Sequence, residues 1–189
     1  MTQNKIVTYT MPKLSFKTKT LATVIAVFSA VALPQLFHLL GKGLGIGTSL
    51  GEILLPMHLP VLMLGILAGP VAGIFVGLTA PFISHFLTGM PGEAMLVFIA
   101  IELMVYGAAI GLMKNVNIPT IAKVLVAQLT GRAERAIAIL VSVHLMGNTV
   151  IEPTIILTSV KVGLAGMLIQ LVLLPLFVRI VGEAEENEH

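Results

Sequence analysis

The 189-residue sequence contains no cysteine, no tryptophan and no aspartate, and only 11% of its residues are charged. Without cysteine, the chain can form no disulfide, thiolate metal site or thiol nucleophile. Without aspartate, it lacks common magnesium ligands and aspartyl nucleophiles. The motifs G-x-x-x-x-G-K-[ST], H-E-x-x-H and G-x-S-x-G are also missing. We therefore predict that the chain is not an enzyme, holds no cofactor or metal, and does not itself hydrolyse ATP.

Apolar residues dominate the composition: 57% of the chain is hydrophobic and the mean hydropathy is +1.02. A soluble domain carries about 25% charged residues, so this chain has too little charge to cover a surface that faces water. The apolar runs are continuous rather than alternating, which favours membrane helices over a membrane β-barrel. The formal net charge of +2 does not indicate a nucleic-acid partner. The sequence predicts an all-α integral membrane protein in contact with the lipid bilayer.

Glycine, proline and polar residues divide the hydrophobic sequence into segments that are each long enough to cross a bilayer. Six spans are predicted, at residues 21–40, 53–68, 71–87, 94–113, 120–146 and 154–181. A basic segment (1–20) precedes this membrane domain (21–181), and an acidic tail (182–189) follows it.

Basic residues gather on one side of the predicted bundle. The segment 1–20 holds four lysines, and Lys114, Lys123 and Arg179 fall on the same side if there are six spans. The opposite connections (41–52, 88–93 and 147–153) contain a single lysine, Lys42, and no arginine. The positive-inside rule then predicts that both termini are cytoplasmic in a multi-pass protein of the cell membrane.

Small residues recur every four positions in several spans. The first span carries Ala22, Ala26 and Ala30, and the glycines form a similar ladder at 65, 69, 73, 77, 107 and 111. Such stripes let helix backbones approach closely. We expect the glycines to pack within the bundle. The alanine ladder fits internal packing and a docking face for another protein's helix equally well on spacing alone.

Ionisable residues inside the predicted spans are costly and need partners or a wet cavity. Away from their cytoplasmic ends, where Lys123 and Arg179 lie, spans four to six contain three cations (Arg132, Arg135 and Lys161) and two acids (Glu102 and Glu134). Internal salt bridges are one interpretation; an anionic or polar ligand is the other, because one cation is left without an acid. Side chains one helical turn apart extend the candidate substrate site to Glu102, Tyr106, Arg132, Arg135, His144, Asn148, Thr158 and Lys161.

The chain resembles the substrate-binding S components of energy-coupling factor (ECF) vitamin transporters. The resemblance covers residues 20–181 and rests on a combination of features rather than one motif. These are the basic N-terminus, the alanine ladder, the pair Gly131-Arg132, and the stretch GEILLPMHLPVLMLGILAGPVAGIFVGLTAPFISHFLTGMP followed by IELMVYGAAIG. The latter stretch is similar to the branch that includes pantothenate and riboflavin carriers.

The resemblance implies a function that needs partners. It implies a water-soluble vitamin bound in an outward-facing pocket that the connection 41–52 closes. It also implies that Ala22, Ala26 and Ala30 dock onto a membrane coupling subunit (T component), which two cytoplasmic ATPases drive in a bacterial ABC importer. The excess cation favours pantothenate, a carboxylate; cobalamin, vitamin B6, hydroxymethylpyrimidine and riboflavin stay open. A stand-alone secondary transporter or channel, and an assembly subunit, are the alternatives from other classes.

Overall fold

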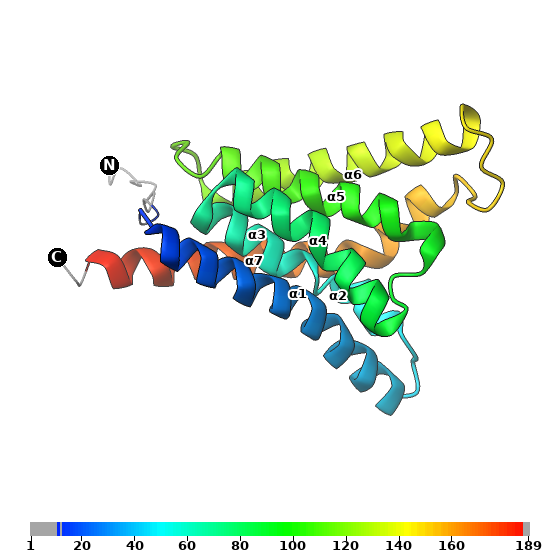
Figure 1. Cartoon of the computed structure of the whole chain (residues 1–189), viewed down its shortest axis with the longest axis horizontal. Helices are drawn as coiled ribbons and strands as arrows, with labels where there is room; N and C mark the ends of the chain where they lie inside the picture. The colour runs from blue at the N-terminus through cyan, green and yellow to red at the C-terminus, as the bar shows by residue number, and fades with distance from the viewer. Residues whose placement is uncertain (1–10, 12, 187–189) are drawn as a thin grey trace, which may run out of the picture.

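The computed structural model describes residue 11 and residues 13–186, and this part of the chain folds into helices without any strand (Figure 1). In chain order the helices are α1 (Phe16–Gly43), α2 (Ser49–Leu54), α3 (His58–Ala68), α4 (Pro70–Thr88), α5 (Glu93–Leu112), α6 (Thr120–His144) and α7 (Ile155–Glu186). The prediction of an all-helical protein is confirmed.

Within the described part of the chain, five segments are long and apolar enough to cross a membrane, so the chain is a multi-pass membrane protein. They are α1, the combined segment Ser49–Ala68 of α2 and α3, α4, α5, and Ile155–Ala184 of α7. α6 has 25 residues but carries four charged side chains, at positions 123, 132, 134 and 135. These charges separate α6 from the other five, so the sixth span stays a prediction.

The ends of the helices differ from the predicted boundaries in four places. The connection 41–52 contains the start of α2, and the predicted span 53–68 is interrupted at Leu55, which has a left-handed φ of 50°. α1 begins at Phe16 because the Ser15 hydroxyl accepts a hydrogen bond from the Thr18 backbone N–H at 3.2 Å. α7 continues to Glu186, into the predicted acidic tail. Residues 1–10, 12 and 187–189 of the two terminal segments lie outside the described residues.

Glycines let α3, α4 and α5 pack backbone to backbone. A Cβ on Gly107 in α5 would overlap the carbonyl oxygen of Gly73 in α4, and a Cβ on Gly77 would overlap the carbonyl oxygen of Leu103. At the end of these helices, a Cβ on Gly111 would lie 2.5 Å from Pro70. The internal packing expected for the glycine ladder is therefore confirmed for every member except Gly69, where a Cβ would meet nothing within 4 Å. A turn at Gly69, whose φ is 98°, joins α3 directly to α4.

The alanine ladder faces the inside of the same bundle. Ala30 is fully buried and Ala26 is 8% exposed, both within the main hydrophobic core, and Ala22 is half-buried against that core. α3 and α4 pack on the side of α1 that carries Ala22, Ala26 and Ala30, so the ladder takes part in internal packing, and its role as a docking face stays a prediction. Large apolar residues, among them Val24 and Phe28, occupy the outward side of α1 instead.

The start of α1 and the end of α7 lie at the same end of the bundle (Figure 1). The connection between α6 and α7 lies at the other end, together with the end of α1 and α2. This second end is where the polar side chains of several helices meet.

We expect Gly107→Ala to destabilise the bundle, because the added methyl group enters the backbone of α4. Overpacking of a tight core costs about 1–3 kcal/mol or more. Gly43→Ala is the matched control, since a Cβ there meets nothing within 4 Å. Heating each variant in detergent and following helical circular dichroism would measure the effect. Equal unfolding temperatures for the two variants would contradict the backbone contact.

Candidate functional site

A cavity of about 350 Å³ opens in the half of the bundle away from the start of α1 and the end of α7. Every described helix contributes to it: the C-terminal halves of α1 and α4, Gly51 and Glu52 of α2, the starts of α3, α5 and α7, and the middle of α6. Its lining residues include Gln35, His38, Glu52, Leu55, Met57, His58, Ser84, Met90, Met95, Ile99, Arg132, Arg135, Thr158, Ser159 and Val162.

A buried carboxylate lies beneath this cavity and contacts two arginines. Glu102 of α5 is fully buried. Arg135 donates a hydrogen bond from Nη1 to Glu102 Oε2 at 2.8 Å, and Arg132 Nε lies 3.1 Å from Glu102 Oε1. His58 Nε2 of α3 approaches the same Oε1 to 3.6 Å. The predicted internal salt bridge of Glu102 is therefore confirmed, with both candidate arginines.

Several polar atoms of this cluster make no hydrogen bond within the described chain. They are all three nitrogens of the Arg132 guanidinium, Arg135 Nε, both ring nitrogens of His58, the Tyr106 hydroxyl, and Glu102 Oε1, whose ion pair with Arg132 lacks hydrogen-bond geometry. A buried donor without an acceptor costs about 1–3 kcal/mol. The cluster therefore contains both donors and acceptors that no group of the described chain satisfies, and most of the unpaired donors belong to the two arginines.

A glycine lets α6 come close enough to α5 for these contacts. A Cβ on Gly131 would lie 2.9 Å from the Tyr106 ring and 3.0 Å from the Glu102 carbonyl oxygen. Tyr106 is fully buried and meets the His58 ring edge to face, with centroids 5.1 Å apart. The residue that follows Gly131 is then aimed at Glu102, which explains why the pair Gly131-Arg132 occurs inside a hydrophobic helix.

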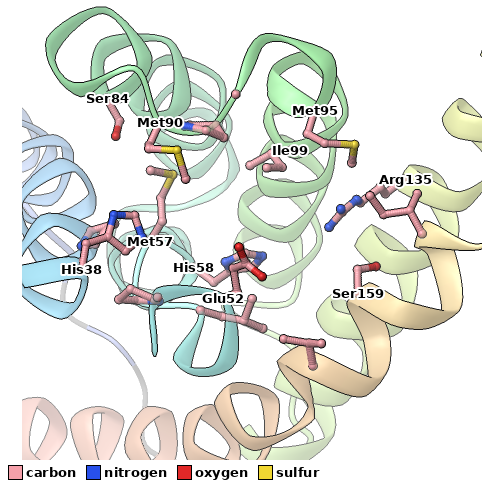
Figure 2. A pocket seen from close by; sticks show the side chains of 18 of the residues that line it. His38, Glu52, Met57, His58, Ser84, Met90, Met95, Ile99, Arg135 and Ser159 are labelled. Atoms are coloured by element: carbon pink, nitrogen blue, oxygen red, sulfur yellow. The ribbon is translucent and has the colours of Figure 1, made fainter. Parts of the chain in front are cut away.

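The remaining walls of the cavity are mostly apolar. In Figure 2, Arg135 points into the cavity from α6, while Met57 and Met90 line it from the connections before α3 and after α4. Ser84, Thr158 and Ser159 add hydroxyl groups to the lining. Glu52 lies at the rim on α2 and is exposed to solvent. Among the described residues, no group of three potential ligands is placed to hold a metal ion.

The short helix α2 is held at the cavity by close contacts with α1 and α7. Gly51 lies directly against the His38 ring, and a Cβ on Gly166 of α7 would lie 2.6 Å from the Leu54 backbone. Below them, Gln128 of α6 donates to Gln170 Oε1 of α7 at 3.1 Å. Gln170 in turn donates to the Leu55 carbonyl oxygen at 3.5 Å. These bonds tie the left-handed turn after α2 to the middle of the bundle.

The structure brings five of the eight predicted substrate-site residues together. Arg132, Arg135 and Thr158 line the cavity, whereas Glu102 and Tyr106 lie behind the two arginines and support them. Glu102 and Tyr106 therefore contribute to the electrostatics of the cavity without forming its wall.

His144, Asn148 and Lys161 do not line this cavity, so their assignment to a substrate site stays a prediction. His144 is exposed in the last turn of α6, and Lys161 is exposed on α7. Asn148 is used locally: its Nδ2 donates to the Ser142 hydroxyl at 3.0 Å, and its Oδ1 accepts from the Val150 backbone at 2.9 Å. The position of a residue along its helix did not determine whether its side chain points toward the cavity.

The sequence analysis did not assign His38, His58 or the methionines at positions 57, 90 and 95 to the site, although all of them line it. His58 had a usable signal. It is a polar residue between Pro56 and Pro60 in an otherwise apolar run, at the first residue of a helix. The methionines had none, because methionine is as common in a buried core as in a binding wall.

Comparisons of the chain with protein-family models, with curated proteins and with solved structures found no match. The interpretation of the cavity therefore rests on its own geometry.

We expect Glu102→Gln to destabilise the folded protein strongly, because the two buried arginines would lose their counter-ion. Removing one partner of a buried ion pair costs about 3–5 kcal/mol. Glu134→Gln is the matched control: Glu134 is exposed on α6 and makes no ion pair with the described residues. Thermal unfolding of both variants in detergent would measure the difference. A Glu102→Gln variant as stable as the control would mean that the ion pairs contribute little.

Proposed function

We propose that this chain is the substrate-binding S component of an ECF-type vitamin importer, which binds its solute from outside and transfers it through an ATP-driven partner. Pantothenate is the favoured solute. One observation supports the proposal most directly: residues of the stretch that resembles S components line the cavity. Within the stretch 51–91 they supply much of the cavity wall, namely Gly51, Glu52, Leu55, Pro56, Met57, His58, Ser84, Met90 and Pro91.

The size and lining of the cavity support a small organic solute. A volume of about 350 Å³ lies at the lower end of the range for small-molecule pockets, about 300–1,000 Å³. Apolar walls with a few convergent polar groups are typical of such sites. Arg132 and Arg135 favour an anion, and the absence of tryptophan, phenylalanine and tyrosine from the lining disfavours stacking on a riboflavin ring.

The topology supports an outward-facing site in a six-span bundle with cytoplasmic termini. α1 and α7 start and end at one side of the bundle, which six crossings would produce (Figure 1). At about 1.5 Å per residue, the 25 residues of α6 are long enough to serve as the sixth span. Three of its charges are internal: Lys123 donates to the Lys114 carbonyl oxygen at 3.1 Å, and Arg132 and Arg135 face Glu102. The cavity lies on the side opposite the start of α1, which carries Lys17 and Lys19.

The partners follow from the resemblance and from the missing phosphate-binding loop. A membrane coupling subunit and two cytoplasmic ATPases of a bacterial importer would supply the energy that this chain has no motif to provide. Since Ala26 and Ala30 are buried, the coupling subunit would contact the outer side of α1, where Val24 and Phe28 are exposed, or would require the bundle to open at the alanine ladder.

Transport measurements separate the proposal from a self-sufficient carrier. The purified chain in nanodiscs is expected to bind pantothenate, whereas liposomes that contain the chain alone accumulate none against a gradient. Isothermal titration calorimetry measures the first property and uptake of labelled vitamin the second. Uphill uptake driven only by a proton or sodium gradient would overturn the proposal in favour of a secondary transporter. Absence of any small ligand would favour an assembly subunit.

Filling the cavity is expected to abolish binding without unfolding the chain. Ser159 lines the cavity, so Ser159→Trp places a large ring in the space for the solute. Leu157→Trp is the matched control, because Leu157 is on the same helix, 68% exposed and not part of the lining. Calorimetric titration should show at least about 100-fold weaker binding for Ser159→Trp only. Unchanged affinity in Ser159→Trp would show that the solute binds elsewhere.

A further inference from the structure

The buried part of the cavity carries one positive charge more than it can neutralise. Two guanidinium groups, Arg132 and Arg135, share the single carboxylate of Glu102. The other carboxylate in the lining, Glu52, is exposed at the rim and forms no ion pair with either arginine. Transfer of a charge out of water is unfavourable unless it is paired. The excess charge therefore calls for an anion that the described chain does not contain.

The unused hydrogen-bond donors lie on the same two arginines. Arg132 makes no hydrogen bond with any of its nitrogens, and Arg135 uses only Nη1 within the described chain. Bound water could accept from these donors, but water would leave the charge in place. An oxyanion would satisfy both requirements, and the planar fork of a guanidinium matches the two oxygens of a carboxylate.

The surroundings of the arginines narrow the class of anion further. One excess charge is balanced by a monoanion, and a dianion would place a second negative charge next to Glu102. Met57, Met90 and Met95 provide apolar wall, and Ser84 and Ser159 provide hydroxyl groups. These features fit a compact aliphatic acid that also carries hydroxyl or amide groups.

We propose that Arg132 and Arg135 form the specificity-determining floor of the cavity and select a small monocarboxylate over its neutral analogues. Glu102 is a positioning residue that aims both guanidinium groups and does not touch the solute. Arg135, which points into the cavity in Figure 2, makes the more direct contact. This inference rests on the proposed function, because it assumes that the cavity binds a solute.

The test compares an acid with its neutral analogue in the full-length chain in nanodiscs. The probes are pantothenate and panthenol, in which CH2OH replaces the carboxylate; calorimetry gives a Kd for each. The wild-type chain is expected to prefer the acid by about 30-fold or more, the effect of removing one partner from a buried charge pair. Arg135→Gln should reduce this ratio to near one, and Arg132→Gln should reduce it by at least about tenfold.

The ratio of the two Kd values is informative because a purely structural role would weaken both ligands equally. Lys161→Gln is the matched control: it removes one cation from the exposed side of α7, outside the cavity, and should leave the ratio unchanged. Arg135→Lys keeps the charge without the fork and should give an intermediate ratio. If one glutamine variant fails to fold, the other and the wild-type ratio still decide. A wild-type ratio near one, or a ratio unchanged in the folded arginine variants, overturns the inference.

Failure of the inference is distinguishable from failure of the proposed function. If the solute is not pantothenate, native mass spectrometry of the chain after incubation with a bacterial extract would identify it. A bound neutral or cationic vitamin would overturn the selection of a monocarboxylate and leave the S-component proposal standing. A bound carboxylic acid would support the inference, whether or not excess pantothenate displaces it. A chain that binds no small molecule would overturn both.

Discussion

The carboxylate of Glu102 determines how the polar part of this bundle is arranged. It is fully buried on α5, and it meets Arg132 and Arg135 of α6 as well as His58 of α3. These contacts require α6 to approach α5 closely, which Gly131 permits. Because a single carboxylate serves two guanidinium groups, the same contacts that join the helices also leave a positive charge unmatched. The positive charge at the floor of the cavity is thus a consequence of the close packing of α6 against α5.

A charge of this kind can be kept in a membrane protein only where its surroundings are polar. Arg132 and Arg135 lie in the middle of α6, and an arginine at the centre of a span costs about 2.5–3.5 kcal/mol on insertion scales. The cavity reaches them from one end of the bundle, so water or a solute can enter beside them. The charges that distinguish α6 from the five apolar segments are therefore consistent with a membrane helix that lines a wet site.

Hydropathy and the positions of glycine and proline were sufficient to predict an all-helical membrane protein and the approximate positions of its long helices, although not the separate helix α2. They were less informative about the site, because span depth does not specify which way a side chain faces. Arg132, Arg135 and Thr158 line the cavity, whereas Lys161, one turn from Thr158, is exposed outside it. The left-handed turn at Leu55 had no sequence signal, since leucine rarely adopts a φ of 50°. That turn separates α2 from α3 and brings His58 to Glu102. Because the conformation of Leu55 could not be predicted, the position of this part of the cavity lining could not be predicted either.

The two sides of the cavity are held together by different kinds of contact. Glycine-mediated backbone packing joins α3, α4 and α5, which carry Glu102 and His58, and such packing leaves little room for sliding. On the other side, α2 rests on His38 of α1 and on Gly166 of α7, and two glutamines secure the turn that follows it. A solute in the cavity would contact both sides at once. Its binding energy would then act between the arginine floor and α2, so occupancy of the site would stabilise the contact of α2 with the rest of the bundle.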